Sequence, residues 1–110
     1  MSDLTKRRCQ PCEGGIPALT KEQVAPLMLE TPLWFADEKF TTIARTFELG
    51  DFQDVIVLVN KIARVAEMEG HHPNLYVHNY NRLTVSLSTH AVRGLTENDF
   101  ILAAKIDQLL

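Results

Sequence analysis

The run DFQDVIVLVNKIARVAEMEG, residues 51–70, carries the clearest helix signal in the chain. It opens on Asp51 and Asp54, acidic residues that suit the positive end of a helix dipole. It closes on Gly70, the residue type that most often follows a helix C-terminus. Its apolar residues recur at three- and four-residue spacing and predict one core stripe, made of Phe52, Val55, Ile56, Val59, Ile62, Ala63 and Ala66.

A second, thinner apolar row runs along the same predicted helix and consists of Leu58, Val65 and Met68. A helix that is apolar on two sides needs two surfaces to pack against. The row therefore indicates either a deeply buried helix or a contact between subunits, and the spacing leaves both readings open.

Two strands are predicted after this helix. The first covers residues 74–80 and places Tyr76, His78 and Tyr80 on one side. The second covers residues 82–90 and alternates cleanly, with Leu83, Val85 and Leu87 on its apolar side. His90 would then project from the open side of the sheet, away from the helices.

The remaining elements are predicted from capping and turn signals. Thr20 and Gln23 have capping-box spacing before a short helix that ends at Pro32. Residues 40–49 indicate a hairpin strand, in which Arg45 is unusual among apolar neighbours. Thr96 and Asp99 form a second capping-box pair before the last helix.

The predicted order is α-β-β-α-β-β-α, which indicates an α+β fold with a four-stranded antiparallel sheet and three helices on one face. A chain of 110 residues has room for one domain. Residues 1–18 are polar and aperiodic, and we expect a flexible N-terminal arm there. Residues 19–110 are expected to form the single domain.

Composition excludes several classes of protein. The net charge of -3 argues against a main role in binding the phosphate backbone of nucleic acid. No apolar run approaches the roughly 20 residues of a membrane span, and the N-terminal residues lack the apolar stretch of a secretory signal. We therefore expect a cytoplasmic protein that contacts neither membranes nor nucleic acid directly.

Cys9 and Cys12 form a C-x-x-C pair within the arm. One such pair supplies only two of the four ligands of a structural zinc, and a redox pair would normally open a helix beside a strand. We interpret them as two reduced thiols, with a metal or redox role as the less favoured alternative.

Three of the four histidines invite a functional reading. His71 and His72 occupy a helix-to-strand turn, and His90 is the third. Imidazole titrates at about pH 6.5, so it can give or take a proton at neutral pH. Spacing alone leaves acid–base chemistry, metal binding and no function all open. It also leaves two readings for Glu67, a solvated helix end or a histidine partner, and two for Asp99, a helix cap or a site residue.

The pattern Glu67-x3-His71-His72-Pro73-x6-Tyr80-x9-His90-x8-Asp99 resembles the signature of the pterin-4a-carbinolamine dehydratases. The resemblance extends over about Leu19 to Leu110, and every signature position is filled. Two departures stand beside it. The Trp that family members often have shortly after His-His-Pro is absent here, and the stretch between Pro73 and Tyr80 is one residue longer than in many members.

The resemblance implies a lyase that dehydrates 4a-hydroxytetrahydropterin (4a-hydroxytetrahydrobiopterin) to quinonoid dihydropterin in tetrahydrobiopterin recycling. It implies no metal and no organic cofactor. It assigns His71 and His90 to acid–base catalysis, and it gives His72 a place in the catalytic set with a mainly substrate-positioning role. The substrate-binding residues it implies are Glu67, His72, Pro73, Tyr80 and Asp99.

The resemblance also implies partners. Family members are usually dimers or tetramers, which favours the subunit-contact reading of the second apolar row. Animal members also act as dimerisation cofactors of a homeodomain transcription regulator, so a non-catalytic binding module is the alternative function. A pterin-binding protein with another role, in molybdopterin metabolism or beside a hydroxylase, is a third reading.

Overall fold

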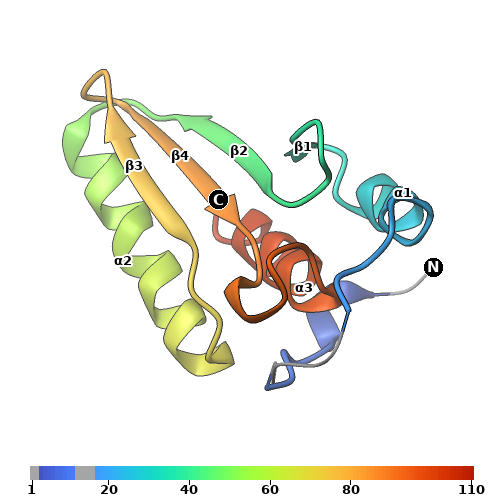
Figure 1. The fold of residues 1–110 in the computed structure, drawn as a ribbon. Coiled ribbons are helices and arrows are strands. Elements are labelled where there is room, and N and C mark those ends of the chain that lie inside the picture. The colour runs from blue at the N-terminus through green and yellow to red at the C-terminus, as the bar shows by residue number, and fades with distance from the viewer. Residues whose placement is uncertain (1–2, 12–16) are drawn as a thin grey trace.

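The computed structural model describes residues 3–11 and 17–110 of the chain. The predicted α+β class and its element order are confirmed (Figure 1). The helices are α1 (Lys21–Glu30), α2 (Phe52–Glu69) and α3 (Glu97–Asp107), with two short 3-10 turns, η1 (Leu4–Lys6) and η2 (His90–Val92). The strands are β1 (Phe35–Ala36), β2 (Ile43–Glu48), β3 (Asn74–His78) and β4 (Arg82–Leu87).

The four strands form one antiparallel sheet in the order β1-β2-β4-β3. The alternation predicted for β4 is confirmed, because Leu83, Val85 and Leu87 are buried while their neighbours are not. These side chains meet Ile43 and Phe47 of β2 in the main core cluster, which the inward faces of the helices complete. The sheet therefore has one apolar side, against which α2 and α3 pack (Figure 1).

The capping signals also hold. Thr20 and Gln23 form a capping box at the start of α1, and Thr96 and Asp99 form another at the start of α3. These reciprocal bonds satisfy backbone N–H groups that the first helical turn leaves unpaired. Asp99 of the second capping box is also a candidate site residue.

The core stripe predicted on α2 is partly wrong. Val55, Leu58, Ile62 and Ala66 are buried, whereas Phe52 is 52% exposed and Ile56 37% exposed. Leu58, placed by the sequence pattern in the outer row, thus lies in the core. Both rows satisfy three- and four-residue spacing, and the buried side of α2 includes residues from each of them. Periodicity alone therefore could not predict which side of the helix faces the core.

Arg45 lies on the apolar side of β2, where a charge is unexpected. Its guanidinium lies 4.1 Å from the centroid of the Phe47 ring and donates to Asp107 Oδ1 at 2.5 Å. The same carboxylate oxygen accepts the indole N–H of Trp34 at 2.9 Å. The cation is therefore paired and stacked, which is how proteins tolerate a partly buried charge.

Both predicted strands of the second hairpin extend too far. Asn79 and Tyr80 take left-handed φ values of 50° and 51° and form the turn after β3. At the other end β4 stops at Leu87, so His90 is not a strand residue but the first residue of η2. The Thr89 N–H donates to the Gly94 carbonyl at 2.7 Å, and this bridge turns the chain back before a longer strand can form.

The described part of the N-terminal arm packs against the rest of the protein. Leu4 in η1 is 3% exposed and belongs to the core cluster, and η1 packs against α3. Arg7 forms an ion pair with Glu97 at 2.6 Å. These contacts could not be predicted from local sequence patterns, because Arg7 and Glu97 are 90 residues apart in the chain. Cys12 lies outside the described residues.

Candidate active site

The three candidate histidines border one pocket. It has a volume of about 310 Å³ and lies where the end of α2 approaches η2 and the first turn of α3. That volume is at the lower end of the range typical of small-molecule sites, roughly 300–1,000 Å³. The lining residues are Gln10, Gly70, His71, His72, Ser88, Thr89, His90, Ala91 and Asn98.

The backbone at the end of α2 directs the side chains of the two adjacent histidines to different partners. Gly70 takes a left-handed φ of 65°, which ends the helix, and Pro73 disfavours helical backbone at His72. The His71 N–H still bonds to the Ala66 carbonyl at 3.3 Å, so the residue is tied to the helix end. The side chains of His71 and His72 then take different partners.

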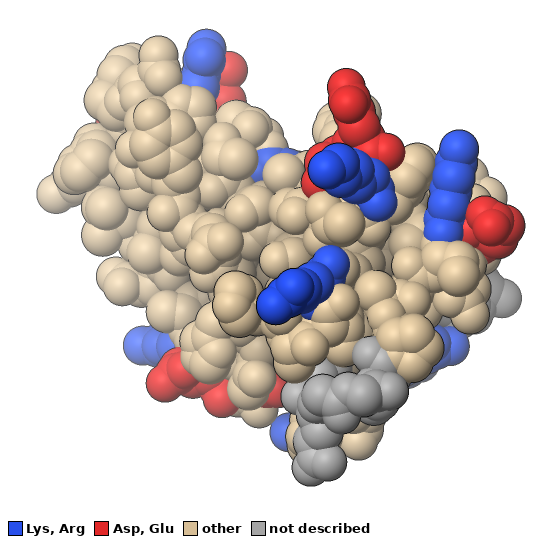
Figure 2. Space-filling model, viewed as in Figure 1, with Lys and Arg blue, Asp and Glu red and all other residues tan. Residues whose placement is uncertain are grey.

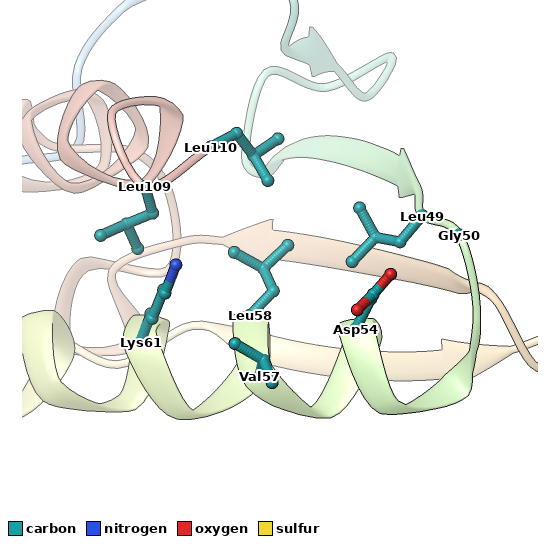
Figure 3. Close-up of a pocket in the computed structure, with 8 residues that line it drawn as sticks. All are labelled: Leu49, Gly50, Asp54, Val57, Leu58, Lys61, Leu109 and Leu110. Atoms are coloured by element: carbon teal, nitrogen blue, oxygen red, sulfur yellow. The ribbon is translucent and has the colours of Figure 1, made fainter.

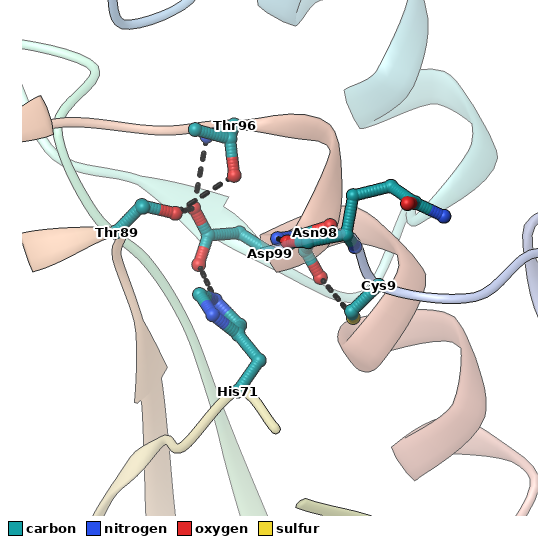
Figure 4. A network of polar contacts seen from close by, with 7 residues as sticks. Cys9, His71, Thr89, Thr96, Asn98 and Asp99 are labelled. Atoms are coloured by element: carbon teal, nitrogen blue, oxygen red, sulfur yellow. Dashed lines mark hydrogen bonds and ion pairs between the residues drawn. The ribbon is translucent and has the colours of Figure 1, made fainter. Parts of the chain in front are cut away.

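His71 pairs with a buried carboxylate. Its Nε2 lies 2.6 Å from Asp99 Oδ1, with the His71 side chain 11% exposed and Asp99 fully buried (Figure 4). A hydrogen bond of this kind fixes the ring orientation and leaves Nδ1 as the second proton-transfer site. Among the described residues, no side chain or backbone group bonds to that Nδ1.

The second oxygen of Asp99 is also occupied. Oδ2 accepts the Thr89 hydroxyl at 2.9 Å and the Thr96 backbone N–H at 3.0 Å, and the two threonine hydroxyls lie 2.8 Å apart (Figure 4). One carboxylate thus caps α3 with one oxygen and holds His71 with the other. The two readings left open for Asp99 are compatible in this structure.

His72 pairs with Glu67 rather than with Asp99. Its Nε2 hydrogen-bonds to Glu67 Oε2, and the side chains are 60% and 75% exposed. A pair this exposed contributes little to stability, about 0–1 kcal/mol, but it can orient the imidazole. Glu67 is therefore a hydrogen-bond partner of a histidine, which was one of the two interpretations that its position in the sequence allowed.

His90 reaches the same pocket from η2. It follows the buried Thr89, and its own side chain is exposed. Within residues 3–11 and 17–110, no hydrogen bond holds its imidazole. Its ring is therefore accessible to a ligand, whereas the ring of His71 is fixed from behind by Asp99.

Four of the predicted site residues do not line this pocket: Asp99 and Glu67, which hydrogen-bond to its histidines, and Pro73 and Tyr80. Tyr80 is 66% exposed in the turn after β3, whereas His71 precedes the other end of that strand. Pro73 follows His72 but does not line the cavity. Within a single chain the structure brings together His71, His72, His90 and Asp99, with Glu67 behind His72.

The sequence reading missed Gln10, Ser88 and Asn98, which also line the pocket. Asn98 gives no signal of its own because it lies inside a capping box, and Gln10 belongs to the aperiodic N-terminal arm. Ser88 lies two residues before His90 and, like Asn98, could be suspected only from its nearness in sequence to a predicted site residue.

No metal cluster is present in the part of the chain that the structure describes: no three His, Cys, Asp or Glu side chains converge there as ligands. None of the described helices is both long and apolar enough to cross a membrane. A second hollow of about 260 Å³ lies between α2 and the C-terminus and contains no histidine (Figure 3). Its polar side chains are Asp54 and Lys61, and we assign it no chemistry.

Cys9 is packed beside a buried ion pair. Its backbone N–H donates to Glu69 Oε1 at 2.8 Å, and Glu69 Oε2 accepts from Lys105 at 2.6 Å. Burial, together with the Glu69 charge, raises the pKa of the Cys9 thiol to about 12. Burial opposes ionisation of Glu69, but its hydrogen bonds from Lys105 and Cys9 outweigh this and lower its pKa.

We expect Cys9 to react slowly with iodoacetamide at pH 8, because the thiolate is the reactive form and its population is very small there. The rate should be at least ~10²-fold below that of the same residue in urea-unfolded protein. Tandem mass spectrometry can follow modification of Cys9 separately from Cys12. Equal rates in folded and unfolded protein would contradict the described burial.

Comparison with known proteins identifies the family of the chain. The sequence model of the Pterin 4 alpha carbinolamine dehydratase family matches residues 17–109. A provisionally named pterin-4-alpha-carbinolamine dehydratase of Nitrosomonas eutropha is 46% identical over 110 residues, covering 98% of this chain and 94% of the relative. A similarly named protein of Methylococcus capsulatus is 40% identical over 106 residues, covering 96% and 92%.

Solved structures share the fold. A Brucella melitensis protein described as a transcriptional coactivator/pterin dehydratase superposes with a TM-score of 0.77 at 29% identity, covering 84% of this chain and 97% of that one. A pterin dehydratase-like RuBisCO assembly factor of the alpha-carboxysome has a TM-score of 0.58 at 21% identity, covering 69% and 87%, and shows the fold alone. The chain belongs to the pterin 4 alpha carbinolamine dehydratase family, as its sequence signature predicted.

Proposed function

We propose that this protein dehydrates 4a-hydroxytetrahydropterin to quinonoid dihydropterin and water. The observation that carries the proposal is the convergence of three histidines on one pocket, with His71 held from behind by the buried Asp99. Family membership supports the same activity.

The reaction needs two proton transfers. The hydroxyl on C4a must gain a proton to leave as water, and the ring nitrogen N5 must lose one. With its Nε2–H donated to Asp99, His71 offers Nδ1 to the substrate, and the carboxylate stabilises the imidazolium that forms when Nδ1 takes up a proton. We propose that His71 and the accessible His90 share these two transfers.

The outer pair has a different part in this proposal. His72, oriented by Glu67, is more exposed than His71 and contacts the pterin ring without exchanging protons. Pro73 shapes the turn that separates the two histidines. Because Tyr80 lies beyond reach of the pocket in one chain, any contact of Tyr80 with substrate requires a second subunit.

The physiological setting belongs to the same proposal. We place the enzyme in tetrahydrobiopterin recycling in the cytoplasm. The free thiol of Cys9 is the form expected in a reducing compartment.

The test is a dehydration assay with chemically generated 4a-hydroxytetrahydropterin, followed by loss of its absorbance. Purified protein should accelerate the loss well above buffer, and 7,8-dihydrobiopterin should compete with the substrate. A rate equal to buffer, measured on folded protein, would refute the proposed activity.

We also propose that a second copy of the chain covers the exposed apolar side of α2, giving a homodimer or homotetramer. Phe52 and Ile56 are large apolar side chains left in contact with solvent, and Ala63 follows them on the same helix side. The surface over the β3–β4 hairpin also shows few charged side chains in Figure 2. The contact row is thus Phe52 and Ile56, because Leu58 and Val65 belong to the core or pack against it.

Ile56→Glu should lower the molar mass measured by light scattering, since a charge in an apolar interface must be desolvated without a partner. Gln108→Glu is the matched control, because it adds the same charge at an exposed position at the end of α3, away from Phe52 and Ile56. We expect the control to keep the wild-type mass. An unchanged mass for Ile56→Glu would contradict the proposed interface.

The alternative function uses the same surface. The Brucella melitensis relative is described as a coactivator as well as a dehydratase. A non-catalytic module could present Phe52 and Ile56 to a transcription regulator as its dimerisation cofactor. Folded protein that lacks dehydratase activity and forms a stoichiometric complex with a regulator would favour this reading.

A further inference from the structure

The N-terminal strap, defined as residues 3–11, is anchored along the body of the protein. Leu4 is buried in the core cluster and η1 packs on α3, where Figure 1 shows the segment alongside that helix. Arg7 pairs with Glu97, and the Cys9 N–H donates to Glu69. The strap is therefore tied to both α2 and α3.

The strap ends at the histidine pocket in a two-sided hydrogen-bonded contact. The Gln10 N–H donates to Asn98 Oδ1 at 2.9 Å, and Asn98 Nδ2 donates to the Gln10 carbonyl at 2.6 Å. The Cys9 thiol also donates to the Asn98 carbonyl at 3.6 Å. Asn98 is only 6% exposed, so both amide bonds form largely out of water, where they are worth most.

Gln10 and Asn98 line the same cavity as the three histidines. Asn98 immediately precedes Asp99, so one helical turn fixes both the strap and the partner of His71. The other non-histidine lining residues are uncharged, which suits a neutral, polar, flat heterocycle. The family sequence model begins at residue 17, so Gln10 and the rest of the strap lie outside the matched segment, whereas Asn98 lies inside it.

We propose that the strap forms a fixed wall of the substrate pocket, with Asn98 as the positioning residue that holds Gln10 against the pterin. The inference rests on the proposed dehydratase function. The wall contributes to binding and takes no part in proton transfer, because His71, Asp99 and Thr89 form their network without it.

Asn98→Ala removes both amide bonds and tests the wall by kinetics. Each bond contributes up to about tenfold, so KM for the carbinolamine should rise about 5- to 30-fold. The kcat should stay within about twofold and the pH profile should not change. Gln108→Ala, an exposed amide at the other end of the same helix, is the matched control and should match wild type.

A merely structural role for Asn98 would give a different pattern. It would reduce the amount of active protein, so kcat would fall with thermal stability while KM stayed unchanged. Gln10→Ala tests the wall in a variant that should still fold. Gln10 is exposed, and its substitution leaves both hydrogen bonds between its backbone and Asn98 in place. It should raise KM at least about threefold without a change in melting temperature.

Trypsin cleavage after Arg8 gives a readout independent of turnover. Saturating 7,8-dihydrobiopterin should slow this cleavage several-fold in the wild type, and Asn98→Ala should be cut faster with little protection. An active wild type whose KM and cleavage are indifferent to Asn98→Ala and Gln10→Ala overturns the strap proposal alone. A folded wild type with no dehydratase activity overturns the proposed function, and the strap proposal with it.

Discussion

His71→Ala should lower kcat for carbinolamine dehydration by about 10²–10⁴-fold, the range lost when a general acid–base residue is removed. The physical reason is that no other side chain reaching the pocket from the described residues has a buried carboxylate fixed against its ring. The measurement is the initial rate of absorbance loss at saturating substrate, with circular dichroism to confirm folding. His90→Ala should show a loss in the same range.

His78→Ala is the matched control for these variants. His78 bonds to Thr84 and Asn79 and stacks on Tyr76, and it does not line the pocket. Its replacement should leave kcat within about twofold. If His71→Ala stays as active as His78→Ala, the proposed catalytic role of the pocket is wrong.

Asp99→Asn should lower kcat by about 10²–10⁴-fold as well, because an amide does not stabilise the imidazolium and does not select the same ring orientation. It should also lower the free energy of unfolding by about 1–3 kcal/mol, since the introduced amide would disturb the capping box and the Thr89 bond. The two effects are measured by the dehydration assay and by urea unfolding.

Thr96→Ala separates the two effects of Asp99. It removes the capping hydroxyl but leaves the His71–Asp99 bond and the Thr96 backbone donor in place. We expect about 0.5–2 kcal/mol of lost stability with kcat reduced far less than in Asp99→Asn. Equal losses of kcat in the two variants would mean that Asp99 acts only through the helix cap.

Local elements of this fold were predictable because they depend on neighbours in sequence. The capping residues of α1 and α3 and the alternation of β4 are examples. The orientation of α2 was not, because two apolar rows had equally good spacing and only the rest of the core decides which faces inward. The predicted end of β4 was wrong for a similar reason, since the strand is stopped by the Thr89–Gly94 bridge, a contact that local alternation does not indicate.

The site likewise contains residues that the sequence could predict and contacts that it could not. His71 and His72 were recognisable from their turn, but their convergence with His90 followed only from the family resemblance. That one carboxylate both caps α3 and holds His71 could not be read from Thr96 and Asp99 alone. The contact of Gln10 with Asn98 spans 88 positions in sequence and carries no local pattern.

In the proposed mechanism His71 and His90 together perform the dehydration from one pocket. The most direct measurement is the dehydration rate of chemically generated 4a-hydroxytetrahydropterin with wild type, each single alanine variant and the His71→Ala/His90→Ala double variant. We predict strong acceleration by wild type, a large loss in each single variant and a rate near buffer for the double. A double variant that keeps most of the wild-type rate would contradict the account.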